Sequence, residues 1–207
     1  MMRQGDLIVI SGFSGAGKGT VVKRLMAEGT FGLSISATTR SPREGEVHGR
    51  EYFFLSKDEF KQRIEEGRFL EWAEFSGNYY GTPKDYVLDQ MHEGKDVILE
   101  IEAQGALQVK KQYPDAGLIF LVAPSMTLLK ERLTGRGTEN PEQVARRLNQ
   151  ARREIESMNE YDYIVVNDDL EECVDKVQQI IETLHERACE KQALIDSFRD
   201  EAARLGL

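Results

Sequence analysis

A glycine-rich stretch near the N-terminus, residues 12–20 (GFSGAGKGT), has the residue types and spacing that bind a polyphosphate. Gly12 and Gly17 take the first and sixth places of the pattern G-x-x-x-x-G-K, and glycine lets the backbone turn tightly and bring its N–H groups close to an anion. Lys18 adds a positive charge for the β- and γ-phosphates. The stretch predicts a phosphate-binding loop rather than an ordinary glycine-rich turn. The residues expected to contact the polyphosphate there are Gly12, Phe13, Ser14, Gly15, Ala16, Gly17, Lys18, Gly19 and Thr20.

The position after the lysine decides how directly this loop can ligate a metal ion. A Ser or Thr directly after the lysine usually binds Mg²⁺ in such loops. Here that residue is Gly19, and the first hydroxyl comes one residue later, at Thr20. We therefore expect Thr20 to reach the metal or the phosphates by another path.

The elements around the loop alternate between strands and helices. An apolar run at 7–11 precedes the loop and a helical pattern follows it, which directs the positive end of a helix dipole at the bound phosphates. Further apolar runs, rich in β-branched residues, lie at 97–101, 118–122 and 163–166. Short runs of this kind, separated by helices, are typical of a buried parallel sheet. The sequence therefore predicts an α/β fold with a parallel core sheet flanked by helices.

Residues 34–95 differ from this pattern and predict a small α+β insertion. Ser56 and Glu59 form a capping box for a short helix. Residues 70–75 are then expected to form a strand, and Thr82 with the following proline is expected to begin a second helix.

A second excursion follows the run at 118–122. Ser125 can cap a helix that extends to Leu133, residues 135–140 (GRGTEN) interrupt it, and Pro141 begins a long helix. Residues 130–153 hold seven Lys or Arg and three Glu, within a chain of net charge −9. A basic segment in an acidic chain suggests a small anionic ligand and argues against a protein that coats nucleic acid.

Length and composition indicate one domain with inserted subregions. The chain has 207 residues, of which 40% are hydrophobic and 30% charged. No apolar stretch approaches the roughly 20 residues of a membrane span, and the chain enters a strand too early for a signal peptide, so we expect a cytoplasmic protein with no membrane partner. The two cysteines, Cys173 and Cys189, suggest neither a disulfide nor a zinc site. His48, His92 and His185 are scattered and are expected to be surface or packing residues.

From residue 169 onward, apolar residues recur at helical spacing, which predicts one or two helices packed on the core. The acidic end of this tail can cover the core or take part in self-association. The oligomeric state is not readable from the sequence.

The insertion carries a second chemical cluster. Arg40 and Arg43 flank a proline, and Tyr52 follows; guanidinium groups pair bidentately with phosphate, although a solvated loop has the same composition. Glu71 lies within the apolar alternation of its strand, so we expect it to be partly buried and to need a donor. Glu, Ser and Thr side chains together can accept hydrogen bonds from the adjacent N1 and N2 donors of guanine, a pair that adenine lacks.

The motifs S-x-T-T-R-x-P-R-x-G-E (36–46), G-x-x-Y-x-F (49–54), E-W-A (71–73) and G-N-Y-Y-G-T (77–82) resemble the signature of guanylate kinases. The resemblance covers residues 7–184. It implies a P-loop nucleoside monophosphate kinase fold that transfers the γ-phosphoryl group of ATP to GMP, with Mg²⁺, and so recycles purine nucleotides and supplies GTP synthesis. Activity on dGMP is also expected, because no residue identified here reads a ribose 2′-hydroxyl.

The resemblance also implies roles for individual residues. Ser36, Glu71 and Thr82 would hold the guanine base, and Arg40, Arg43, Tyr52 and Tyr80 the GMP phosphate. Arg132, Arg136 and Arg147 would close over the phosphates as a lid, and Asn167 would lie beside the adenine of ATP. The residues expected to be catalytic are Lys18, Arg40, Arg43, Arg132, Arg136 and Arg147.

The implied division of the chain has three parts and a tail. The core is 5–33, 96–125 and 156–185; the GMP-binding region is 34–95; the lid is 126–155; and a helical tail is 186–207.

The chain departs from the family pattern at the loop and at one strand end. Many guanylate kinases have Pro at the position of Phe13 and Ser at that of Gly19. The strand end that often has the pattern D-x-D carries Glu100 and Glu102 instead, and either carboxylate can hold a magnesium-bound water or a guanine amino group. With Thr20, Glu100 is the candidate metal ligand.

Two other functions compete with this interpretation. Another nucleoside monophosphate kinase would share the fold, but Glu71, Ser36 and Thr82 suit guanine donors. A guanylate-kinase-like scaffold module would bind peptides without catalysis, but such modules typically have a degraded phosphate loop, whereas Lys18 and its glycines are intact here.

Overall fold

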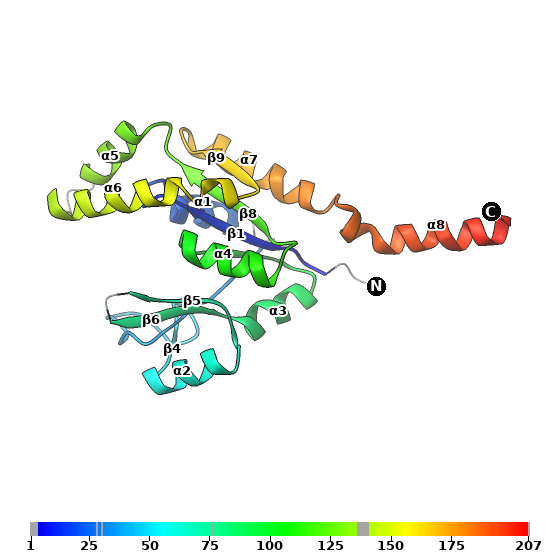
Figure 1. Ribbon diagram of the computed structural model, residues 1–207, viewed down its shortest axis with the longest axis horizontal. Helices are drawn as coiled ribbons and strands as arrows, with labels where there is room; N and C mark the ends of the chain where they lie inside the picture. The colour runs from blue at the N-terminus through cyan, green and yellow to red at the C-terminus, as the bar shows by residue number, and fades with distance from the viewer. Residues whose placement is uncertain (1–3, 28, 30, 76, 136–140, 207) are drawn as a thin grey trace.

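The computed structural model describes residues 4–27, 29, 31–75, 77–135 and 141–206. Its core is a five-stranded parallel sheet with the order β2-β7-β1-β8-β9 (Figure 1). The strands are β1 (Leu7–Gly12), β2 (Phe31–Leu33), β7 (Asp96–Glu100), β8 (Gly117–Val122) and β9 (Tyr163–Val166). This confirms the predicted α/β class and the four strands expected from apolar runs.

The central strand β1 is buried along its whole length, since helices cover both faces of the sheet. Leu7 pairs with Val97 on one side, and Val9 pairs with Leu118 on the other. The sequence analysis missed β2, because this three-residue strand has Gly32 at its centre and shows no apolar run.

Helices position the core sheet against the rest of the molecule. The helix α1 (Lys18–Met26) follows the phosphate loop and packs against α7 (Leu170–Leu184). The helix α4 (Ala103–Gln112) contacts both β1 of the core and β5 of a second sheet, so it lies between the two sheets (Figure 1).

The second sheet has four strands in the order β4-β3-β6-β5 and forms most of the insertion. Its strands are β3 (Ala37–Thr38), β4 (Phe53–Phe54), β5 (Phe69–Phe75) and β6 (Asn78–Pro83). The helices beside it are α2 (Lys57–Glu65) and α3 (Lys84–His92). The capping box of Ser56 and Glu59 is formed as predicted. Thr82 lies within strand β6, where it pairs with Glu71 of β5, so the next helix begins only at Lys84.

Two helices lie above the phosphate loop: α5 (Met126–Thr134) and α6 (Pro141–Ile155). The hydroxyl of Ser125 accepts a hydrogen bond from the Leu128 N–H, which confirms the predicted cap of α5. Most of the expected interruption, residues 136–140, lies outside the described residues. A short 3-10 helix, η1 (Met158–Glu160), then leads into β9.

The C-terminal tail divides into two parts. Helix α7 packs on the core, as predicted, and a 3-10 helix, η2 (Ala188–Lys191), follows it. The last helix, α8 (Gln192–Leu205), has no buried residue and projects from the body (Figure 1). The expectation that the tail covers the core is therefore wrong for α8, whose Leu194, Phe198 and Leu205 side chains are exposed to solvent.

Within the described part of the chain, none of the helices combines the length and the hydropathy needed to cross a membrane. The boundaries of the core, GMP-binding region, lid and tail stay a prediction.

Candidate active site

The phosphate loop leaves the C-terminal end of β1 and closes around the side chain of Lys18. The ammonium group donates hydrogen bonds to the carbonyl oxygens of Gly12 (2.6 Å) and Phe13 (3.4 Å). Gly17, directly before α1, has φ +96°, and a Cβ there would lie 2.4 Å from Nδ2 of Asn167. The loop therefore needs glycine at this position both for its backbone conformation and for the close approach of Asn167.

Asn167 anchors the loop from the end of β9. Its side-chain amide donates a 2.8 Å hydrogen bond to the backbone carbonyl of Ala16. Its backbone carbonyl accepts a 2.9 Å hydrogen bond from the guanidinium of Arg132 in α5. Beside these contacts lies a cleft of about 500 Å³. Its lining residues are Gly15, Gly17, Thr20, Arg132, Gly135, Asn167, Asp168 and Leu170.

A second arginine reaches the loop from α6. Arg147 donates a 2.9 Å hydrogen bond to the hydroxyl of Ser14. Together with Lys18 and Arg132, it brings cationic groups from three different helices to one loop, which suits a polyphosphate. Arg136 lies outside the described residues, so its place relative to this group stays a prediction.

The carboxylates of Glu100 and Glu102 lie at the end of β7 and the start of α4. The pKa of Glu100 is raised, chiefly because burial removes water from the carboxylate. The positive charge of Lys18 lowers this pKa, and the negative charge of Glu102 raises it further. A Cβ on Gly19 would lie 3.4 Å from Oε1 of Glu100. Carboxylate oxygens beside a phosphate loop are the donors that Mg²⁺ prefers, so these residues fit the ion.

Thr20 and Glu100, the two candidate metal ligands, have different neighbours in the structure. Thr20 lines the cleft with Asn167 and Asp168, whereas Glu100 lies beside Gly19. The expected pairing of Thr20 and Glu100 around one metal ion stays a prediction.

The second sheet holds the candidate base-binding group. The hydroxyl of Thr82 donates a 2.6 Å hydrogen bond to Oε1 of Glu71, and both residues are buried. Burial raises the pKa of Glu71, while the bonds from Thr82 lower it. Ser36, the third expected member, is partly buried and directly precedes β3.

Gly105 of α4 packs against Glu71 and was missed by the sequence analysis. A Cβ at Gly105 would lie 2.7 Å from Oε2 of Glu71. The only signal in the sequence is a glycine inside a helical pattern, which often marks close packing but does not identify the partner.

Arg40 is held by a residue to which no role had been assigned. Its guanidinium makes two 2.9 Å hydrogen bonds to the carboxylate of Glu46, which raises the pKa of Arg40 and lowers that of Glu46. The guanidinium carbon lies 5.4 Å from the ring centre of Tyr52, and Tyr80 also contributes to the raised pKa. Arg43 is exposed, and its backbone N–H donates to Glu46 at 2.7 Å.

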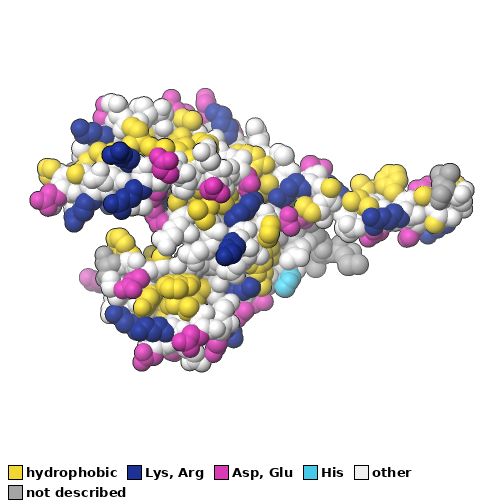
Figure 2. Space-filling view, viewed as in Figure 1, with side chains coloured by type: hydrophobic (Ala, Val, Ile, Leu, Met, Phe, Trp, Pro, Cys, Tyr) yellow, Lys and Arg dark blue, Asp and Glu magenta, His cyan; other side chains and the backbone are white. Residues whose placement is uncertain are grey.

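The structure thus forms two groups of expected site residues. One surrounds the phosphate loop, and the other lies on the second sheet. Helix α4 lies between them, with Glu102 as its N-cap and Gly105 in its first turn. Figure 2 shows the surface hollowed between these two parts of the molecule. Among the described residues, no hydrogen bond or ion pair joins Arg40 or Arg43 to the loop.

Comparison with known proteins identifies the family. A family model described as guanylate kinase matches residues 4–184. The crystal structure of a guanylate kinase from Anaplasma phagocytophilum is similar, with a TM-score of 0.72 and 31% sequence identity, over 91% of this chain and 90% of that chain. A gluconokinase from Sinorhizobium meliloti 1021 matches with a TM-score of 0.47 and 15% identity, over 90% of this chain and 96% of that chain, and carries no argument here. Since the family model spans most of the 207 residues, the chain belongs to the guanylate kinase family.

Proposed function

We propose that this protein transfers the γ-phosphoryl group of ATP to GMP, and also to dGMP, giving ADP and the corresponding diphosphate. Membership of the guanylate kinase family supports the reaction. The observation that carries the choice of acceptor is the buried pair of Glu71 and Thr82, because it offers a carboxylate to a base with two adjacent N–H donors.

Recognition of the base follows from the ionisation of Glu71. A carboxylate accepts from both N1–H and the N2 amino group of guanine, whereas adenine presents an acceptor at N1 and would leave the buried oxygen atoms without donors. Thr82 fixes Oε1 of Glu71, and the hydroxyl of Ser36 supplies a further polar contact for the base.

Capture of the acceptor phosphate requires Arg40 to exchange partners. In the structure the guanidinium is paired with Glu46 and stacked near Tyr52. We expect the GMP phosphate to take part of this hydrogen bonding, with Arg43, Tyr52 and Tyr80 completing the contacts. Glu46 then acts as a positioning residue that holds Arg40 ready before GMP arrives.

The chemistry itself requires placement and charge compensation. The nucleophile is a phosphate oxygen that is already anionic near neutral pH, so no general base is needed. Lys18 and the loop N–H groups would orient the β- and γ-phosphates. Mg²⁺, held by Glu100, Glu102 or the Thr20 hydroxyl, would supply neutralising charge on the phosphates when bound.

The arginines of α5 and α6 would compensate charge on the transferred group. Arg132 and Arg147 already contact Asn167 and Ser14, the residues that frame the loop, and Arg136 is expected to join them. Approach of these helices to the second sheet would close the hollow between the two groups and exclude water, which otherwise competes as the acceptor. We propose a cytoplasmic location for this activity.

The test is ADP formation from ATP and Mg²⁺ with GMP, dGMP, AMP, CMP or UMP, against a control without acceptor. We expect GMP, alone among the ribonucleotides, to accelerate ADP release well above the control. Acceleration by AMP or UMP to the same extent would favour a different monophosphate kinase. GMP binding without turnover would favour the binding-module function.

A further inference from the structure

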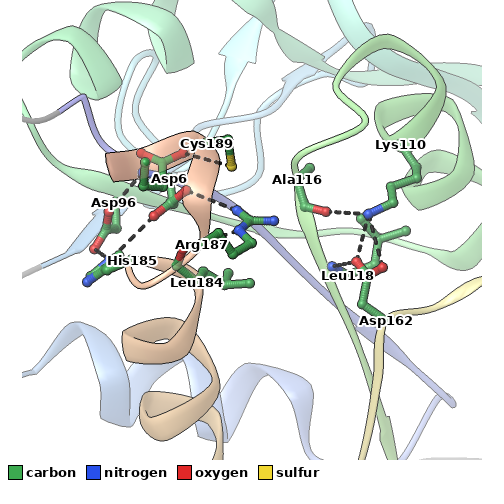
Figure 3. Close-up of polar contacts among 11 residues, drawn as sticks. Asp6, Asp96, Lys110, Ala116, Leu118, Asp162, Leu184, His185, Arg187 and Cys189 are labelled. Carbon is green, nitrogen blue, oxygen red and sulfur yellow. Dashed lines mark hydrogen bonds and ion pairs between the residues drawn. The ribbon is translucent and has the colours of Figure 1, made fainter. Parts of the chain in front are cut away.

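A compact cluster of Asp6, Asp96 and His185 lies at the N-terminal ends of the core strands, at the opposite end of β1 from the phosphate loop (Figure 3). Asp6 directly precedes β1, Asp96 begins β7, and His185 follows the last residue of α7. The cluster therefore joins the N-terminal ends of two neighbouring parallel strands to the point where the chain leaves the core for η2 and α8. The kinase mechanism uses none of these residues.

Both carboxylates direct one oxygen toward the same imidazole nitrogen. Nε2 of His185 lies 2.9 Å from Oδ2 of Asp96 and 3.5 Å from Oδ2 of Asp6. The three candidate ligand atoms all lie within 4.8 Å of one another. Asp6 and Asp96 are 6% and 8% exposed, whereas the His185 side chain is 26% exposed, so the cluster is buried on the protein side and reachable from solvent through the imidazole.

The other oxygen of each carboxylate is held by a second partner. Arg187 donates to Oδ1 of Asp6 at 3.2 Å, and the backbone N–H of Asp6 donates to Oδ1 of Asp96 at 2.8 Å. These contacts fix the rotation of both carboxylates and leave their Oδ2 atoms facing Nε2. Hydrogen bonds to the outer atoms of ligands orient side chains in this way around bound metal ions.

We propose that Asp6, Asp96 and His185 bind a divalent transition-metal ion, and that Zn²⁺ is the ion that fits best. Zinc bonds to imidazole nitrogen and carboxylate oxygen are about 2.0–2.2 Å long, so tetrahedral ligands lie roughly 3.4 Å apart, close to the two separations found here. Zn²⁺ would take the place of any proton on Nε2, and water would complete the coordination at the solvent-exposed side.

Such a site would be structural rather than catalytic. The phosphate loop follows the C-terminal end of β1, whereas Asp6 lies at the N-terminal end of that strand. Binding of an ion would connect β1, β7 and the end of α7, and so stabilise the junction from which α8 projects (Figure 1). The sequence around His185 does not indicate this cluster, because Asp96 and Asp6 lie about 90 and 180 positions away in the chain.

The experiment uses the full chain, freed of metal with a chelator and kept without nucleotide. Zn²⁺ binding is measured by equilibrium dialysis, thermal unfolding is followed with and without Zn²⁺, and Co²⁺ is added as a spectroscopic probe. We expect one equivalent of Zn²⁺ to bind, the visible absorption of four-coordinate Co²⁺ to appear, and Tm to rise by about 5 °C at a Zn²⁺ concentration near 100 times the dissociation constant.

Two variants and two controls locate the ion. His185→Gln and Asp96→Asn are expected to weaken Zn²⁺ binding at least about tenfold and so to remove at least about half of the Tm rise at the same Zn²⁺ concentration, while turnover of ATP and GMP is unchanged. His92→Gln removes an exposed histidine of α3, and Cys189→Ser removes the exposed thiol near the cluster; both are expected to bind Zn²⁺ as the wild type does.

Three results would overturn the proposal. The first is less than one equivalent of Zn²⁺ bound by the wild-type chain, which leaves the cluster as a hydrogen-bonded ion pair only. The second is an unchanged affinity in a folded His185→Gln or Asp96→Asn protein. The third is a loss of binding in Cys189→Ser, which would place the ion on the thiol instead.

Discussion

The hydroxyl of Thr82 donates a 2.6 Å hydrogen bond to Oε1 of Glu71, and both side chains are buried where β5 pairs with β6. The bond fixes one oxygen of a carboxylate whose pKa is raised by burial. The other oxygen lies against Gly105 of α4. Both oxygen atoms of the Glu71 carboxylate are therefore held in place, and the proposed recognition of the GMP base can be tested at single residues.

Glu71→Gln is expected to reduce kcat/KM for GMP by about 10- to 150-fold, which corresponds to the loss of a charged hydrogen bond worth about 1.5–3 kcal/mol. The replacement amide cannot accept from both N–H groups of guanine. The measurement is steady-state kinetics with GMP and AMP. Glu74→Gln is the matched control, since Glu74 lies on the same strand but is exposed. Equal losses in both variants would remove Glu71 from base recognition.

GMP affinity is expected to fall as the pH is lowered, beginning above the usual titration range of a glutamate. In the proposed pocket guanine would bind the ionised form of Glu71, and burial raises the pKa of that group, so protonation would compete with GMP at a higher pH than for an exposed carboxyl. The measurement is the Kd of GMP from pH 7 down to the acid limit of folding. A Glu71→Gln protein with the same pH profile would contradict the assignment.

The same shift makes a prediction for stability. Because the pKa of Glu71 is raised in the folded state, its contribution to stability is complete below the unfolded-state pKa and is lost as the pH rises through the folded-state pKa. Glu71→Gln should therefore be at least as stable as the wild type near pH 7, as measured by urea unfolding. A lower midpoint for the variant at this pH would show that the ionised carboxylate stabilises the fold.

Gly105→Ala is expected to raise KM for GMP about tenfold. The added Cβ would lie 2.7 Å from Oε2 of Glu71, so the carboxylate must move from its place in the pocket. Overpacking of this kind typically costs about 1–3 kcal/mol. Gln104→Ala, on the exposed side of the same turn, is the control. Unchanged GMP kinetics in a folded Gly105→Ala protein would show that the pocket adapts without loss of binding.

Arg147→Ala is expected to lower kcat at least about 100-fold, with a smaller effect on ATP affinity, because its charge is needed most on the transferring group. Arg146→Ala removes the same charge from the neighbouring, exposed position and is the control. Arg136→Ala is expected to behave like Arg147→Ala. The measurement is single-turnover phosphoryl transfer together with ATP titration, and near-normal turnover in Arg147→Ala would exclude it from the mechanism.

Local sequence patterns were sufficient to predict much of the fold. Apolar runs located four strands of the core sheet, the glycine and lysine spacing located the phosphate loop, and Ser56 with Glu59 located a helix start. Each depends on residues close together in the chain. The burial of Glu71 was also predicted, because its place in a strand alternation is a local property.

Tertiary structure decided the partners of these elements. Glu46 positions Arg40 through the fold of an irregular loop, and Gly105 meets Glu71 only because α4 packs on β5. His185 meets Asp96 across 89 positions of sequence. No local periodicity predicts such contacts, since they depend on how the loops, helices and strands pack against one another. The exposure of α8 also follows from tertiary structure alone. Its amphipathic sequence pattern predicts a helix, but only the packing of the described residues determines that no other element covers its apolar side chains.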